Sequence, residues 1–324
     1  MTLYHRIAAG VVAAGAGALA WGLHEAAGQF RVREHDVPLL PAGSGELRVL
    51  HVSDFHLVPG QDARVGVLRS LAELEPDLVV FTGDAMGSVG ALPTVLEALD
   101  PLLDFPGVFV FGSNDYYGPR PRNPFTYFRS PTSGGPKEAP AHLPASDLAD
   151  ALAARGWLNL NNARGTLTAG GVHLSVVGVD DPHRHFDDLP ADDGVRATLH
   201  VGVAHAPYAR ILDEFLLEGC QIAFSGHTHG GQVCVPGYGA LVTNCDIPRW
   251  RASGLQGWPA LRPDGVAIAP RRTFAPIPRE LRAAAPGEPG MWLNISAGVG
   301  TSPFAPVRFA CPPEVSLLTL RERA

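Results

Sequence analysis

The chain has 324 residues, of which 46% are hydrophobic and 18% charged, and its formal net charge at pH 7 is −7. This composition is ordinary for a folded globular protein, and the length allows one large domain or two modest ones. The sequence has neither a basic run nor a stripe of Lys and Arg with interleaved aromatic residues, so nucleic-acid binding is not expected.

The first predicted element is an uncharged segment, Ile7 to Leu23, with the sequence IAAGVVAAGAGALAWGL. As a helix it would span about 26 Å, slightly less than a ~30 Å hydrocarbon core. We expect residues 1–30 to be a separate hydrophobic segment that associates the protein with a membrane as an anchor. There are two alternatives. The segment could be a secretory signal with a small-x-small cleavage site at Ala18-Leu19-Ala20, in a secreted protein, or a helix packed on the domain of a cytoplasmic protein. The sequence does not indicate the side of the membrane.

After a Pro- and Gly-containing linker at residues 38–45, strands and helices alternate along the chain. Strands are predicted at 46–53, 77–84, 107–113, 173–179, 197–205, 221–227, 291–297 and 314–320, and helices at 63–74, 93–99 and 146–155, the last opened by a Ser146 cap. The segments 119–145 and 239–290 are predicted to be a loop and an irregular insertion. The pattern indicates an α/β domain with packed sheets over residues 46–324.

Polar side chains follow the predicted strands at the points where these strands end. They are Asp54, His56, Asp84, Asn114, Asp115, His205, His227 and His229. Ligands bind at the carboxyl edge of an open α/β sheet, so we expect these side chains to lie together. Carboxylate, imidazole and amide groups suit divalent Mn, Fe, Zn or Co. With one bridging carboxylate, they would hold two ions.

The order and spacing of these residues resemble the calcineurin-like metallophosphoesterases, whose pattern is Asp-x-His, Gly-Asp, Gly-Asn-His-Asp/Glu, His and Gly-His-x-His. The most specific match is GHTHGGQ at 226–232, while GVDDP at 178–182 and GVGTSPFAPVRF at 298–309 resemble a bacterial branch that often has an amino-terminal membrane segment. The resemblance implies a four-layer α-β-β-α sandwich of two mixed sheets.

The resemblance also implies a role for each candidate ligand. The first metal site would consist of Asp54, His56 and His229, the bridge of Asp84, and the second site of Asn114, His205 and His227. A water or hydroxide between the two ions would then attack phosphorus.

The segment FGSNDYYG at 111–118 departs from the family pattern, which supplies a metal-binding Asn and then a His that protonates the leaving oxygen. Alignment on Asn114 keeps the amide and places Asp115 at the His position. Alignment on Gly112 places Ser113 and Asn114 at the two positions. Asp115 and Asn114 are therefore candidate catalytic residues, and His227 of the GHTHGGQ motif is a third candidate. We expect an ionised Asp115 and a preference for leaving groups of low pKa.

Several other polar residues are interpreted without a fixed role. His51, His173 and His200 lie inside predicted strands and are interpreted as structural. Arg308 is interpreted as a partner in a buried ion pair, with contact to phosphate as the alternative. Whether Asp180, Asp181, His183 and His185 face the pocket or solvent is open. None of the four cysteines forms a CxxC motif, and pairing of Cys245 with Cys311 is also open.

The predicted function is hydrolysis of a phosphorylated small-molecule or lipid substrate by a dinuclear metal-dependent phosphoesterase. One alternative is a pyrophosphatase that acts at the membrane on a lipid-linked or nucleotide-sugar diphosphate, similar to the UDP-diacylglucosamine hydrolases. Another is a non-catalytic metal-binding scaffold, which is disfavoured because Asp84, His227 and His229 are all present.

Overall fold

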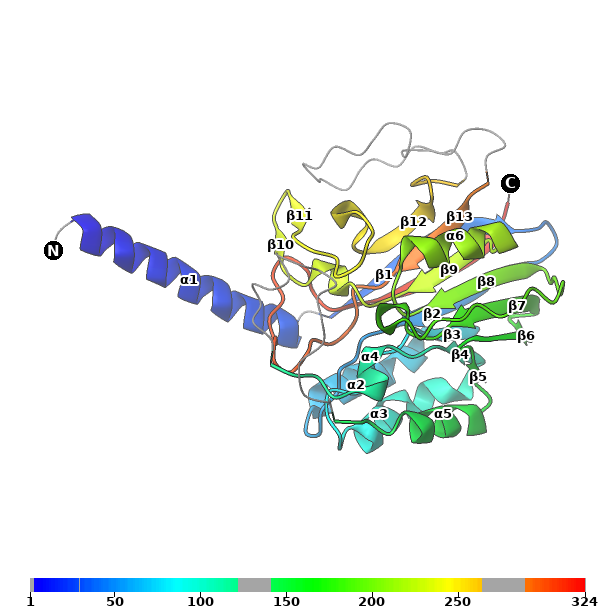
Figure 1. Cartoon of the computed structure of the whole chain (residues 1–324), viewed down its shortest axis with the longest axis horizontal. Helices are drawn as coiled ribbons and strands as arrows, with labels where there is room; N and C mark the ends of the chain where they lie inside the picture. Colours follow the sequence, from blue (N-terminus) through cyan, green and yellow to red (C-terminus); the bar gives the residue numbers. More distant parts are fainter. Residues whose placement is uncertain (1–2, 29, 122–140, 264–288, 324) are drawn as a thin grey trace.

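Two six-stranded mixed sheets form the centre of the protein in the computed structural model, which describes residues 3–28, 30–121, 141–263 and 289–323 (Figure 1). The strands of the first sheet are, in spatial order, β1 (Arg31–Leu40), β14 (Glu314–Glu322), β2 (Leu47–Val52), β3 (Leu78–Phe81), β4 (Gly107–Phe109) and β5 (Leu158–Asn159). Only β14 and β2 pair antiparallel, so β2, β3 and β4 end at the same edge.

The second sheet has a parallel centre and an antiparallel strand at each edge. Its strands are β12 (Gly254–Trp258), β13 (Met291–Ile295), β9 (Ile222–Ser225), β8 (Leu199–Ala204), β7 (Val172–Val179) and β6 (Ala163–Ala169). The four central strands run parallel, so β8 and β9 also deliver the residues that follow them to one edge.

Helices cover the outer face of each sheet, which gives four layers (Figure 1). α2 (Asp62–Ser70), α3 (Leu92–Leu99) and α5 (Ala145–Ala154) pack on the first sheet, where Val65, Val95 and Leu148 belong to the same buried cluster as Phe81. α6 (Ala209–Glu218) covers the second sheet through residues such as Phe215. The predicted α-β-β-α sandwich of two mixed sheets is confirmed.

An apolar layer of strand residues joins the two sheets. Val49 and Val80 of the first sheet belong to one buried cluster with Val201 and Phe224 of the second. Their alternate neighbours on each strand face the helices, as expected for strands buried on both faces. This core fixes the two sheets against each other and therefore fixes the relative positions of the loops at their edges.

Short elements complete the described part of the chain. They are α4 (Ser113–Tyr116), β10 (Cys234–Val235), β11 (Gly239–Ala240) and the 3-10 turns η1 (Leu71–Leu74), η2 (Asp100–Asp104), η4 (Pro182–Arg184), η5 (His229–Gly231) and η6 (Arg249–Arg251).

The structure adds elements that the sequence did not predict. The four edge strands of the two sheets, β1, β5, β6 and β12, and the helix α6 were not predicted. Because β1 pairs along its length with β14, the fold begins before Glu46. The cap expected at Ser146 is wrong, since α5 begins at Ala145 after Pro144 without a side-chain cap. Residues 122–140 of the predicted loop at 119–145 and residues 264–288 of the insertion at 239–290 lie outside the described residues.

The amino-terminal helix α1 (Leu3–Gly28) projects from the domain, with only its last turns in contact (Figure 1). Its most apolar window is 6% buried, so α1 is not packed on the domain along its length, and it is long and apolar enough to cross a membrane. The backbone NH of Arg308 donates to the carbonyl of Gly22 (3.0 Å), and the NH of Ala310 donates to Glu25 (2.9 Å). These contacts hold the base of α1 against the loop that follows β13.

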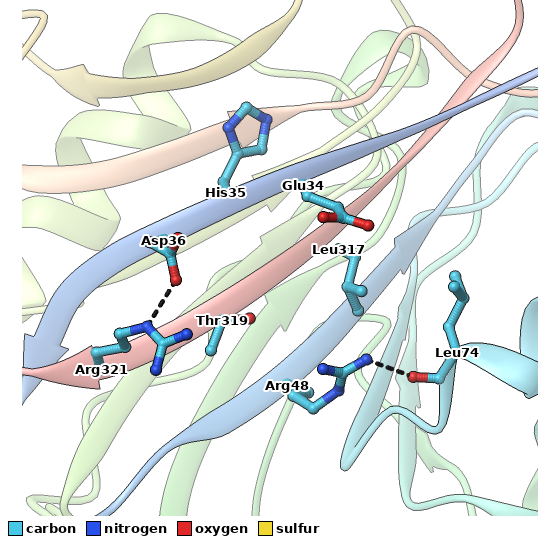
Figure 2. Close-up of a pocket in the computed structure, with 8 residues that line it drawn as sticks. All are labelled: Glu34, His35, Asp36, Arg48, Leu74, Leu317, Thr319 and Arg321. Carbon is cyan, nitrogen blue, oxygen red and sulfur yellow. Dashed lines mark hydrogen bonds and ion pairs between the residues drawn. The ribbon is translucent and has the colours of Figure 1, made fainter.

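A polar pocket of about 230 Å³ lies on the first sheet and is lined by residues of β1, β14, β2 and η1 (Figure 2). Arg321 pairs with Asp36 across it (2.6 Å), and Arg48 donates to the carbonyl of Leu74 (2.7 Å). Arg48 stands near the start of β2, whereas the candidate ligands follow the end of that strand. The pocket is therefore separate from the candidate site.

Candidate metal centre

The loops that carry the candidate ligands are hydrogen-bonded to one another. The NH of Asp54, after β2, donates to the carbonyl of Gly83 (2.9 Å), and the NH of His56 donates to the carbonyl of Asp84 (3.0 Å), after β3. On the second sheet, the NH of Gly226 donates to the carbonyl of His205 (2.8 Å). The carboxyl ends of adjacent strands thus present their polar side chains as one surface.

Five of the candidate ligands have a left-handed backbone. Their φ angles are 55° at Asp54, 45° at His56, 57° at Asp84, 67° at His227 and 49° at His229. This region is unfavourable for residues other than glycine, and such strain persists only where the surroundings enforce it. The loops therefore hold the ligand side chains in fixed directions at a cost in conformational energy.

Four side chains converge at the junction of the two sheets. Ligand atoms of Asp54, His56, Asp84 and His229 all lie within 4.8 Å of one another. The Nε2 atoms of His56 and His229 are 3.1 Å apart, and His229 Nε2 is 3.4 Å from Asp54 Oδ1. Two carboxylates and two imidazoles at these separations form a set of donors suited to one borderline-hard divalent ion.

A second group of donors shares Asp84 with the first. Asp84 Oδ2 is 3.5 Å from His56 Nε2 and 3.6 Å from His205 Nε2. His227 Nδ1 lies 3.2 Å from His205 Nε2. The carboxylate oxygen of Asp84 therefore faces both groups.

Hydrogen bonds set the histidine tautomers in the second group. His205 Nδ1 donates to the carbonyl of Thr82 (2.6 Å), and His227 Nε2 donates to the carbonyl of Asn244 (3.0 Å). Metal binding requires neutral imidazoles, and in the neutral form of each ring these bonds place the proton on the outer nitrogen. The inner nitrogens, His205 Nε2 and His227 Nδ1, are left with lone pairs directed at the shared space, as in metal-binding histidines.

The buried charges favour a cation here. Burial, with the nearby carboxylates of Asp54 and Asp115, raises the pKa of Asp84 to about 8 against the opposing effect of His205. Burial alone lowers the pKa of His205, but Asp84 and Asp54 raise it to about 9. Asp54 Oδ1 is buried without a hydrogen-bond partner among the described residues. A divalent ion would supply the missing positive charge and a partner for that oxygen, so the residues fit a metal.

Asn114 and Asp115 lie next to Asp84 in α4. The NH of Asn114 donates to Asp84 Oδ1 (2.7 Å), and its side-chain amide donates to the carbonyl of Tyr117 (2.9 Å). Asp115 is fully buried and accepts from the NH groups of Asp84 (2.7 Å), Ala85 (2.8 Å) and Gly112 (2.8 Å). Asp115 therefore joins the two loops, and this geometry gives no support to contact between Asp115 and a leaving group.

The GVDDP segment is tied to the same turn. Ser113 donates to Asp181 (2.6 Å), and the Tyr116 hydroxyl donates to Asp180 (2.8 Å). The His183 ring centroid lies 4.5 Å from that of His227, and His183 Nδ1 is 3.0 Å from the Tyr208 hydroxyl, whereas His185 is exposed. The structure thus places Asp180, Asp181 and His183 at the site, a role that the sequence left open.

The remaining sequence interpretations have mixed outcomes. Arg308 is buried as expected, but its guanidinium donates to the carbonyl oxygens of Ala297 (2.6 Å) and Gly300 (2.7 Å). The expected ion pair is thus replaced by backbone acceptors beside His229. Cys245 and Cys311 are both free thiols, so they do not pair in this structure. His51 and His200 are buried within their strands, whereas His173 is exposed.

The family model of the calcineurin-like phosphoesterases matches residues 47–231. A metallophosphoesterase of Aquifex aeolicus is 27% identical to this chain over 297 residues, and the match covers 87% of each protein. The metallophosphoesterase YkuE of Bacillus subtilis is 25% identical over 257 residues, and the match covers 74% of this chain and 79% of YkuE. Among solved structures, a purple acid phosphatase of yellow lupin is similar at 12% identity and a TM-score of 0.35, and the match covers 58% of this chain and 39% of that one.

The matched residues 47–231 make up more than half of the chain and contain all seven candidate ligands, four of which converge in the structure as a cluster that could hold a metal ion. This chain therefore belongs to the calcineurin-like phosphoesterase family and is a metal-dependent phosphoester hydrolase.

Proposed function

We propose that the protein is a dinuclear phosphoesterase whose two divalent ions share one carboxylate. The proposed ligands are Asp54, His56 and His229 at the first ion, Asp84 between the ions, and Asn114, His205 and His227 at the second. The metals would be Mn, Fe, Zn or Co, the ions that prefer this mixture of oxygen and nitrogen ligands.

The observation that carries the proposal is the position of Asp84 Oδ2 between the two histidine groups, 3.5 Å from His56 Nε2 and 3.6 Å from His205 Nε2. A side chain that served one ion would face one group only. The other oxygen, Oδ1, accepts the NH of Asn114 (2.7 Å), and this bond fixes the carboxylate plane.

Two divalent ions, when bound, supply the positive charge that polarises a phosphoryl group and activates water for in-line attack. The protein contributes by orientation. The carbonyls of Thr82 and Asn244 hold the rings of His205 and His227, and Asp115 holds the loops after β3 and β4 at a fixed separation. Because these groups are positioned before substrate arrives, little reorganisation is needed during the reaction.

A diphosphate substrate at a membrane, lipid-linked or a nucleotide sugar, is the more specific form of the proposal. One segment joins the site to α1: Arg308 contacts the His229 carbonyl (3.4 Å), and its NH binds the carbonyl of Gly22. Near the base of α1, Trp21 is 50% exposed. Tryptophan is enriched at membrane–water interfaces, which supports α1 as an anchor that brings the site close to a bilayer.

The test is metal analysis and hydrolysis by the full-length Asp84→Ala variant, with Asp188→Ala, at an exposed carboxylate, as the control. Loss of a shared carboxylate weakens both sites. We therefore expect Asp84→Ala to retain fewer than two ions per chain and to lose hydrolysis of phosphodiesters and diphosphates, while the control keeps both. Two retained ions with full activity in Asp84→Ala would exclude the bridging role.

A further inference from the structure

We propose that a buried hydrogen-bond chain, which runs from Asn294 through His51, Thr82 and Ser53, orients the Asp54 carboxylate for metal binding. The inference rests on the proposed role of Asp54 as a ligand. It assigns His51, Thr82 and Ser53 as positioning residues, which act on the ion through Asp54 and do not touch it.

The first half of the chain crosses from one sheet to the other. Asn294, on β13 of the second sheet, donates its side-chain NH to Nδ1 of His51, on β2 of the first sheet (2.7 Å). His51 Nδ1 is thus an acceptor, so the proton of the neutral ring is on Nε2. His51 Nε2 then donates to the Thr82 hydroxyl (3.0 Å).

The second half passes through two hydroxyl groups to the carboxylate. Thr82 donates to Ser53 (2.7 Å), and Ser53 donates to Asp54 Oδ2 (2.6 Å). Each hydroxyl has a single proton, and each proton is used once, so all bonds point in the same direction. All five side chains in the series have 0% exposed surface, which means that solvent does not compete for these bonds.

The protonation state of His51 agrees with this order. Burial lowers the pKa of His51 to about 3, which keeps the ring neutral at physiological pH. A neutral ring has one donor and one acceptor, and both are used within the chain. An imidazolium would donate from both nitrogens and could not accept from Asn294.

The two oxygens of Asp54 have different surroundings as a result. Oδ2 accepts from Ser53 and from the NH of His227 (3.1 Å), whereas Oδ1 has no hydrogen-bond partner among the described residues and lies 3.4 Å from His229 Nε2. One oxygen holds the carboxylate in place, and the other faces the candidate metal position. A short hydroxyl-to-carboxylate bond of this kind is among the stronger hydrogen bonds in proteins.

The neighbouring loops pack closely against the Ser53–Asp54 pair. A Cβ atom at Gly226 would lie 1.9 Å from the Ser53 hydroxyl and 2.5 Å from Asp54 Oδ2. A Cβ at Gly298 would lie 2.5 Å from the Asp54 Cβ. The backbone of the neighbouring loops thus touches the Ser53–Asp54 pair directly, and the glycines at these positions are needed for that contact.

The test is Mn²⁺ affinity of the full-length protein in detergent, measured by calorimetry after chelation and dialysis. Loss of a hydrogen bond that orients a metal ligand typically weakens metal binding by about 10–100-fold. We therefore expect Ser53→Ala and Thr82→Val to raise the Mn²⁺ dissociation constant by about that factor, and Thr82→Ser, which keeps the hydroxyl, to restore it. The double variant should bind no more weakly than Ser53→Ala alone, because both changes remove the same constraint.

Ser225→Ala is the matched control. Ser225 is also a fully buried serine near the site, on β9, but its hydroxyl has no hydrogen-bond partner among the described residues. Its removal should leave Mn²⁺ affinity unchanged. Unfolding midpoints measured with chelator present would separate loss of folding from loss of orientation.

The possible results discriminate between the proposals. Unchanged affinity in both Ser53→Ala and Thr82→Val, or an equal loss in Ser225→Ala, would overturn the positioning role while leaving the metal site intact. A parent protein that binds no Mn²⁺, Zn²⁺, Fe²⁺ or Co²⁺ would overturn the metal-site proposal and the positioning role together.

Discussion

At the scale of single residues, His183 bears most directly on the chemistry of the leaving group. Its ring lies 4.5 Å from His227 and contacts the Tyr208 hydroxyl, whereas His185, two residues later, is exposed. If His183 donates a proton to the leaving oxygen, His183→Gln should lower kcat/KM for alkyl phosphodiesters by ~10²-fold or more and change aryl esters much less. His185→Gln should change neither.

The measurement is a plot of log kcat/KM against leaving-group pKa for the parent and both variants. A steeper negative slope in His183→Gln is expected, because basic leaving groups depend most on proton donation. Equal slopes for all three proteins would show that His183 has no such role. The parent protein would then lack proton donation from His183 and should itself prefer leaving groups of low pKa, as expected from the sequence.

His51 makes a second prediction at this scale, on stability. The unfolded chain takes up a proton at His51 near pH 6.5, whereas burial lowers the folded pKa to about 3. Above pH 6.5 the His51 ring is neutral in both states, so it does not change the free energy of unfolding. As pH falls from 6.5 toward 3, only the unfolded chain binds a proton at His51, so the free energy of unfolding decreases. The slope is about 1.4 kcal/mol per pH unit.

The check is denaturant unfolding with chelator at pH 6.5 and pH 5. The parent should lose ~2 kcal/mol more than His51→Asn over this interval. His173→Asn, at an exposed histidine, should behave as the parent does. An identical loss in the parent and in His51→Asn would contradict the prediction.

The residues of the candidate site show what a sequence can indicate at this scale. Asp54, Asp84 and His205 directly follow apolar strands, so the strand pattern was enough to bring them together. The pattern could not show the direction of a side chain after a short turn. Asp115, which was expected to face the substrate, instead turns inward and accepts hydrogen bonds from three backbone NH groups.

At the scale of elements, α1 provides a test of membrane attachment. Removal of residues 1–20 deletes most of the exposed helix but keeps Gly22 and Glu25, which bind the loop at 308–310. Removal of residues 1–30 deletes those contacts too. We expect the first variant to be soluble without detergent and active, and the second to unfold at a lower temperature because each lost hydrogen bond costs about 0.5–1.5 kcal/mol.

Membrane fractionation, thermal unfolding and hydrolysis of a soluble aryl phosphodiester would be measured on both variants and the full-length chain. Full-length protein in the soluble fraction without detergent would refute the anchor. Equal thermal stability of the two truncated variants would show that the base of α1 does not stabilise the loop.

The elements that the sequence did not reveal are mostly edges. β1 contains Arg31, Arg33, Glu34 and Asp36, and none of its first six residues is buried, because an edge strand has a neighbouring strand on one side only. It therefore lacks the continuous apolar run that identified β2, β3 and β9. Burial on both faces produces that run, and so the central strands were predictable whereas the edge strands were not.

At the scale of the whole molecule, the candidate site depends on the contact between two sheets. Asp54, His56 and Asp84 follow strands of the first sheet, and His205, His227 and His229 follow strands of the second. The apolar layer between the sheets therefore sets the distances between the two halves of the site. A sequence lists the residues of each half, but only the packed core determines that Asp84 Oδ2 lies between His56 and His205.

The most direct measurement of the central claim is a titration of chelated full-length protein with Mn²⁺, in which bound ions and hydrolysis of an aryl phosphodiester are followed together. If two ions share Asp84, binding should saturate at two ions per chain, and hydrolysis should rise with the second ion. Saturation at one ion with full hydrolysis, or hydrolysis that is independent of added metal after exhaustive chelation, would contradict a dinuclear phosphoesterase.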